Sequence, residues 1–131
     1  MCIRDRLQSL GVNAAIVTGE TPKKEREAIL EGFKRREIKV VANVGVLTTG
    51  FDYPALDTVV LARPTKSLGF YYQMVGRAIR PFEGKDGWIV DLSGNYSRFG
   101  NVADLFISRP PGTTKWAVYS RGTQLTNVVL R

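Results

Sequence analysis

Three residues near the middle of the chain carry side chains that can act on a phosphoryl group. Gln73, Arg77 and Arg80 are spaced four and three residues apart, so on a helix they would share one face. A guanidinium carries a permanent charge and a planar fork, which suits the negative charge that spreads over a phosphoryl group during transfer. An arginine finger of this kind contributes roughly 10³- to 10⁵-fold to turnover. The alternative is that both arginines make ordinary surface ion pairs, worth under about 1 kcal/mol each.

The segment around these residues, 73–80, resembles motif VI of superfamily 2 helicases, Gln-x-x-Gly-Arg-x-x-Arg, at each defining position. The resemblance implies that Arg80 is the main arginine finger and that Arg77 is a second contact to the γ-phosphate. It also implies that Gln73 helps to position nucleotide or water, and that Gly76 belongs to the nucleotide site.

Residues 46–54 resemble motif V of the same superfamily, which follows a strand and ends in Gly-x-Asp-x-Pro. The resemblance implies that Gly50 and Asp52 lie near the nucleotide, and that Thr48 and Thr49 contact nucleic-acid phosphates. A glycine permits close backbone approach, and hydroxyl groups donate hydrogen bonds to phosphates without reading sequence. Many related motifs begin with threonine after the strand, and here Asn43 is the candidate substitute donor. An ordinary crossover loop is the alternative.

Two further segments resemble the same superfamily. Residues 18–21, followed by Glu25 and Arg26, are similar to a segment that precedes motif V. Residues 91–95 are similar to the Asp-x-x-Gly-Asn segment of RadD-type DNA-repair helicases and some phage helicases. A strand-end turn built by Gly94 and Asn95 explains the same residues without a function.

Elements that could position these residues follow one another in alternation. Short apolar runs predict strands, and helical spacing with N-cap signals predicts helices. We expect a fully buried third strand, with unalternating apolar residues on both faces. The order predicts an α/β fold, a RecA-like parallel sheet flanked by helices. The predicted strands are 14–17, 38–44, 58–62 and 88–92, and the helices begin at Thr21–Pro22, with Thr21 as N-cap, and at Ser67, the latter ending near Ile79.

The aromatic run 69–72 allows two interpretations. Phe70 and Tyr71 are predicted to be core residues, because aromatic side chains at this spacing are usually buried. The alternative is an exposed face that docks on a partner lobe.

Length and composition limit the classes of function. The 131 residues, 44% of them hydrophobic, suffice for one domain with a core. A net charge of +7 favours nucleic acid as partner, although a merely solvated basic surface explains it equally. With no histidine and a single cysteine, Cys2, we predict no metal site and no internal disulfide. No apolar run reaches the roughly 18 to 20 residues of a membrane span, so we expect a cytoplasmic protein without membrane contact.

The predicted organisation is a truncated domain. Residues 1–6 resemble a string that often opens gene models from fragmentary assemblies, and we expect them to be a non-native leader. Residues 7–109 are predicted to form the second RecA-like domain of a helicase, truncated at its N-terminus. Residues 110–131 begin with a Pro-Pro-Gly linker and have room for one or two added strands, without a predicted fold.

The sequence lacks a phosphate-binding Gly-x-x-x-x-Gly-Lys-Ser/Thr loop and an Asp-Glu pair. The family resemblance therefore implies that ATP and Mg²⁺ are held mainly by an N-terminal ATP-binding domain, and that the fragment alone is inactive. We predict an ATP-dependent helicase or translocase acting on nucleic acid, with DNA as the favoured substrate. The alternatives are a non-catalytic module that binds nucleic acid or protein, and the motor part of a restriction or remodelling complex.

Overall fold

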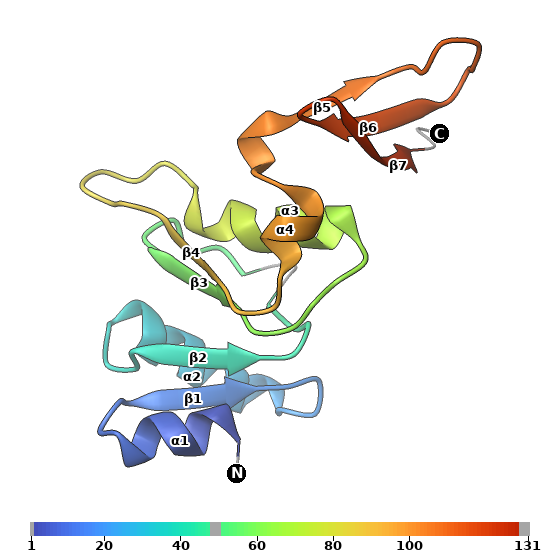
Figure 1. Cartoon of the computed structure of the whole chain (residues 1–131). Coiled ribbons are helices and arrows are strands. Elements are labelled where there is room, and N and C mark those ends of the chain that lie inside the picture. The colour runs from blue at the N-terminus through green and yellow to red at the C-terminus, as the bar shows by residue number, and fades with distance from the viewer. Residues whose placement is uncertain (1, 48–50, 129–131) are drawn as a thin grey trace. The chain divides into compact units, whose positions relative to one another are not determined.

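The structure, a computed structural model, describes residues 2–47 and 51–128. The chain divides into two compact units, Met1–Tyr53 (unit 1) and Pro54–Arg131 (unit 2) (Figure 1). The predicted nucleic-acid contacts Thr48 and Thr49 and the predicted nucleotide contact Gly50 lie outside the described residues. None of the described helices has the length and hydrophobicity needed to cross a membrane.

Unit 1 is built on two short parallel strands, β1 (Ala14–Val17) and β2 (Val40–Asn43). Parallel neighbours need a crossover connection, and α2 (Lys23–Lys34) supplies it. A further helix, α1 (Ile3–Ser9), precedes β1 and crosses the predicted leader boundary at residue 6. Because both strands run the same way, the loops that follow them leave from one edge of this ladder.

The start of α2 differs from the prediction by one residue. Pro22, with φ −54° and ψ 145°, is the N-cap, and the helix begins at Lys23. The Thr21 hydroxyl instead accepts a hydrogen bond from the Thr18 backbone N–H at 2.9 Å. Because that oxygen closes the turn after β1, Thr21 does not cap the helix as predicted.

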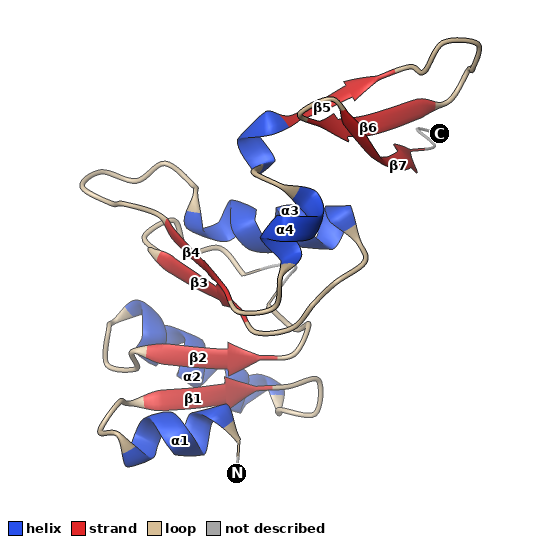
Figure 2. Cartoon of the chain, viewed as in Figure 1, coloured by secondary structure: helices blue, strands red, loops and turns tan. Residues whose placement is uncertain are grey.

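Unit 2 repeats the strand, helix, strand pattern. β3 (Thr58–Leu61) pairs in parallel with β4 (Trp88–Asp91), and α3 (Leu68–Ala78) connects them and packs on one face of the pair (Figure 2). The predicted N-cap of α3 is confirmed, since the Ser67 hydroxyl accepts a hydrogen bond from the Phe70 backbone N–H at 3.2 Å. The core cluster of the unit consists of Leu61, Tyr71, Val75 and Phe99.

The aromatic residues of α3 divide between the core and the surface. Tyr71 is 2% exposed, which confirms it as a core residue. Its hydroxyl donates a hydrogen bond to the Gly100 carbonyl at 2.9 Å. Phe70 is only half-buried, and Tyr72 is 55% exposed.

The predicted parallel pairing is confirmed, but the parallel strands form two separate two-stranded ladders, β1–β2 and β3–β4. The prediction that the third strand is buried on both faces is wrong. Val60, Trp88 and Val90 are 53%, 65% and 39% exposed, and they alternate with inward-facing neighbours along β3 and β4. The reason is that α3 packs on one face of this ladder, so within unit 2 the other face is exposed.

Residues after β4 build a third, antiparallel sheet. α4 (Asn95–Phe99) and a 3₁₀ turn, η1 (Val102–Asp104), lead into β5 (Leu105–Ser108). This strand pairs with β6 (Trp116–Ser120), which pairs with β7 (Thr123–Val128). The sheet therefore joins residues on both sides of position 109, where the predicted RecA-like domain ends.

Candidate ATP-coupling site

The last two turns of α3 present Gln73 and Arg77 on one side of the helix. Four residues separate them, and residues four apart are neighbours on a helix surface. Gln73 is exposed and Arg77 is half-buried. The opposite side of the helix carries the buried residues Tyr71, Val75 and Ala78. The amide and the guanidinium therefore lie on the side of α3 that faces away from the core of unit 2.

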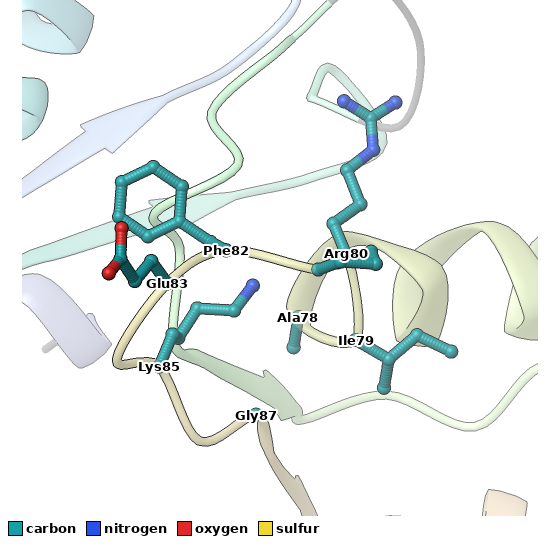
Figure 3. A pocket seen from close by; sticks show the side chains of 8 residues that line it. Ala78, Ile79, Arg80, Phe82, Glu83, Lys85 and Gly87 are labelled. Atoms are coloured by element: carbon teal, nitrogen blue, oxygen red, sulfur yellow. The ribbon is translucent and has the colours of Figure 1, made fainter.

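Arg80 lies beyond the helix, which corrects the prediction that all three side chains share one helical face. The helix ends at Ala78 with Ile79 as its C-cap, and Arg80 is exposed in the following turn. Pro81 is the physical reason, since a proline disfavours the helical conformation in the residue before it. In Figure 3 the side chains of Arg80 and Ile79 extend in different directions from the end of α3.

Two contacts fix the turn that carries Arg80. The Lys85 ammonium donates hydrogen bonds to the carbonyl oxygens of Pro54 at 2.8 Å and Leu56 at 3.0 Å. A Cβ atom on Gly87 would lie 2.6 Å from the Ala78 carbonyl oxygen, so the chain passes closer there than any side chain allows. Neither contact is predicted from the sequence. Lys85 lies three residues before β4, and nothing in the sequence indicates its carbonyl partners.

These residues surround a hollow at the end of α3. It has a volume of about 500 Å³ and is lined by residues 78–83, Lys85 and Gly87 (Figure 3). Arg80 and Lys85 supply two positive charges to its lining, and Glu83 supplies one negative charge. The hollow therefore has a cationic excess beside the turn that carries Arg80.

Gly76 occupies the middle of the last turns of α3 without a packing reason. A Cβ atom at this position would meet no described atom within 4 Å outside the local helix backbone. A glycine inside a helix costs about 1 kcal/mol relative to alanine. The bare backbone leaves room on the same helix for a group from outside unit 2 to approach closely.

The motif V residues described in unit 1 are Asn43 and Asp52. Asn43 is the last residue of β2, and its side-chain oxygen accepts a hydrogen bond from the Leu47 backbone N–H at 3.4 Å. The amide therefore holds the beginning of the predicted motif V loop.

Asp52 is exposed between two aromatic anchors that the sequence analysis overlooked. Phe51 is 8% exposed, and its ring centroid lies 6.2 Å from that of Tyr53. The Phe33 ring of α2 packs on both, at 6.4 Å and 5.6 Å. The two aromatic residues on either side of Asp52 were the feature of the sequence that could have indicated this arrangement. Burying the two rings turns the carboxylate between them outward.

The turn after β1 is held by its own side chains. Arg26 donates from Nη2 to the Thr21 carbonyl oxygen at 3.3 Å. Its Nε is buried without a hydrogen-bond partner among the described residues. The segment 18–26 is thus a braced turn at the carboxyl end of β1, on the same edge as Asn43.

The Asp-x-Ser-Gly-Asn segment after β4 forms a structural junction, as the strand-end-turn interpretation predicts. Asn95 is 1% exposed. Its side chain accepts from the Thr65 backbone N–H at 2.8 Å and donates to the Arg63 carbonyl at 3.1 Å. It also donates to the Ser93 hydroxyl at 2.9 Å. The hydrogen bonds of this amide therefore join the loop after β3 to the end of β4.

Asp91 completes that junction. Burial alone would raise the pKa of its carboxyl. Hydrogen bonds donated by the Tyr96 and Ser93 backbone N–H groups and by the Ser93 hydroxyl outweigh burial, so the pKa of Asp91 lies below its usual value. Its strongest partner is the Tyr96 N–H at 2.6 Å. The carboxylate serves as a turn acceptor, and the described residues contain no cluster of three or more His, Cys, Asp or Glu side chains that could hold a metal ion.

Comparison with known proteins agrees with this arrangement. Residues 2–81 match the family described as helicase conserved C-terminal domain. IRC3 of Saccharomyces cerevisiae, named an ATP-dependent helicase, is 41% identical over 85 residues, covering 64% of this chain and 12% of that protein. A 51.5 kDa protein of a Lactococcus phage is 37% identical over 93 residues, covering 71% of this chain and 21% of that protein. The chain therefore spans only a small part of these relatives.

A solved structure supports the fold. The C-terminal domain of the DEAD-box protein Dbp5 superposes with a TM-score of 0.58 at 25% identity, over 72% of this chain and 56% of that chain. This likeness confirms the predicted RecA-like α/β fold class. The predicted resemblance to superfamily 2 helicases is confirmed as well, because the matched segment covers most of units 1 and 2 up to the Arg80 turn. The chain belongs to the helicase conserved C-terminal domain family.

Proposed function

We propose that this chain is the second motor lobe of an ATP-dependent DNA helicase or translocase, and that its task is to bring arginines to ATP held on a first lobe. The observation that carries the proposal is the end of α3. Gln73, Gly76 and Arg77 lie on its last turns, and Arg80 follows on a turn braced by Lys85 and Gly87. The first lobe, with its phosphate-binding loop, would hold most of the ATP and Mg²⁺.

The residues of α3 suit the phosphates of ATP. ATP supplies the phosphoryl group whose transfer to water drives the motor. Arg80 is exposed and can reach out of the unit, and a guanidinium stabilises charge on phosphate oxygens. Arg77 provides a second cation one turn earlier, and the Gln73 amide can orient nucleotide or water. Gly76 lets the nucleotide or the facing lobe approach the helix without a Cβ in between.

Motif V would couple this site to nucleic acid. Asp52 is exposed between its two aromatic anchors, which suits a hydrogen bond to the ribose. Asn43 at the end of β2, together with Thr48 and Thr49, would contact the phosphates of the strand, and Gly50 would lie near the nucleotide. Contacts from both lobes exist together only in the closed, ATP-bound state, so cycles of closure and opening would move the strand. We further propose that the protein works in the cytoplasm.

The test is Arg80→Ala in the complete protein that includes the ATP-binding lobe. We expect ATP turnover to fall by roughly 10³-fold or more, as for other arginine fingers, with nucleotide binding nearly unchanged. Arg63→Ala is the matched control, because Arg63 is also an exposed arginine of unit 2 outside α3. Turnover and nucleotide affinity are measured for both variants.

Intact turnover in Arg80→Ala would overturn the assignment and favour the non-catalytic module. A loss of turnover with equal loss of nucleotide affinity would instead assign Arg80 to ground-state binding. ATP turnover by the isolated chain with single-stranded DNA completes the test. We expect none, since the phosphate-binding loop is missing from its sequence.

A further inference from the structure

An aromatic pair lies exposed on the C-terminal sheet, away from every residue assigned above. Phe106 of β5 and Tyr119 of β6 are directly opposite each other in the antiparallel register. Their rings stack, with centroids 5.4 Å apart and planes 15° from parallel. Phe106 is 50% exposed. The Tyr119 hydroxyl lies 3.4 Å from Gln124 Oε1 on β7, so polar groups border the pair across the sheet.

The pair does not hold the sheet to the core cluster of unit 2. That contact is made by Val102 and Leu125, which pack on the core cluster of Leu61, Tyr71, Val75 and Phe99. The buried residues of β6 are small or aliphatic: Ala117, Val118 and Ser120. Packing therefore leaves the stacked pair at the surface, with Phe106 half exposed and Tyr119 partly exposed.

The charged residues of this part of the chain are all basic. Residues 105–131 contain four basic residues and no Asp or Glu. Lys115 and Arg121 are exposed and stand immediately outside the two ends of β6. Arg121 Nε also donates to the Asp104 carboxylate, just before β5, at 2.7 Å, and the arginine side chain stays 72% exposed in that ion pair. Six residue steps along a strand separate Lys115 from Arg121 by about 20 Å. A cation near each end of an aromatic surface complements a chain that alternates phosphates with flat rings.

We propose that the Phe106–Tyr119 surface binds single-stranded nucleic acid by stacking unpaired bases. Aromatic rings on a sheet bind any base by its face, and flanking cations attract the backbone phosphates. Bases in a duplex are already stacked on each other, so a double strand offers no free base faces to the pair. The inference goes beyond the motor function, because none of the residues of motifs V and VI takes part.

The experiment is a titration of the 131-residue chain against a fluorescein-labelled oligothymidylate of about 12 nucleotides, read by fluorescence anisotropy. Phe106→Leu keeps an apolar side chain but removes the ring, and we expect roughly ten-fold weaker binding. Phe106→Tyr keeps the ring and is expected to bind within about two-fold of wild type. Trp88→Leu is the control, because Trp88 is a 65% exposed aromatic residue outside this sheet.

Circular dichroism melting of each variant verifies the fold. An equal affinity of Phe106→Leu and wild type would overturn the proposal, since the remaining binding would then come from the motif V loop or from charge alone. Equal loss in Trp88→Leu, or stronger competition by a duplex of the same length, would overturn it as well. Arg80→Ala is expected to bind the oligonucleotide normally, so this result and the ATP-turnover test fail independently.

Discussion

Gly87 passes so close to the end of α3 that a Cβ atom there would lie 2.6 Å from the Ala78 carbonyl oxygen. Ala78 is fully buried and is the last residue of the helix, and Gly87 directly precedes β4. Ala78 and Gly87 are nine positions apart in the sequence, and their backbones meet at this contact. The turn that carries Arg80 is a closed loop, and its shape depends on this approach.

Gly87→Ala is expected to destabilise the chain by about 1–3 kcal/mol, because the clash is with backbone that has to move. Urea unfolding followed by circular dichroism measures the change. Gly19→Ala is the control, since a Cβ at Gly19 meets nothing within 4 Å and its φ is not positive. Equal stabilities of the two variants would show that the contact is not tight in solution.

Lys85→Met is expected to cost about 1–2 kcal/mol, since it removes two charge-assisted hydrogen bonds to Pro54 and Leu56. In the complete protein the same variant should lower ATP turnover, because the Arg80 turn loses its tie to the end of motif V. Lys66→Met, at another exposed lysine of the unit, is the comparison. Normal turnover with lowered stability would limit Lys85 to a folding role.

Gly76→Ala separates stability from activity. In the isolated chain it should raise the free energy of unfolding by about 0.5–1 kcal/mol, because alanine favours the helix and meets no neighbour. In the complete protein it should lower ATP turnover, because the new methyl group fills the space proposed for the nucleotide or the facing lobe. Gly69→Ala on the same helix should stabilise α3 and leave turnover intact. Full activity of Gly76→Ala would remove this glycine from the site.

The lowered pKa of Asp91 predicts that the stability of the folded chain falls in acid. Its pKa is lowered in the folded chain from the usual 3.8, so its contribution to stability is complete above about pH 4 and is lost as pH falls through the folded pKa. Asp91→Asn should unfold about 1 kcal/mol more easily at neutral pH, and the gap to wild type should close in acid. Urea unfolding at several pH values tests this, and a gap independent of pH would contradict it.

Much of the fold could be predicted because the determining interactions are local. The predicted strand 14–17 matches β1 to the residue, and the predicted helix, capped by Ser67 and ending near Ile79, matches α3 within one residue. The prediction for Arg80 is wrong because it extends the helical spacing past the helix end, although Pro81 disfavours the helical conformation in the preceding residue.

The remaining errors concern interactions between residues far apart in the sequence. A continuous apolar run gives the same sequence pattern whether other elements pack on one face of the strand or on both. The exposure of Val60 was therefore not predictable. Asn95 was noted for its turn, but its bonds to Arg63 and Thr65 span about thirty residues. Lys85 gave no signal for the same reason, since its partners are backbone carbonyls without a sequence signature.

The C-terminal sheet has consequences for how the protein behaves at high concentration. β5 and β7 are both outer strands, and outer strands expose backbone groups that can pair with another molecule. β5 is only four residues long, and Pro110 and Pro111 follow it closely. Proline has no N–H to donate, so a second chain could pair with this edge for little more than the four-residue length of β5. Pro110 and Pro111 thus limit aggregation through the β5 edge. Replacing them is expected to increase aggregation of the purified protein during storage.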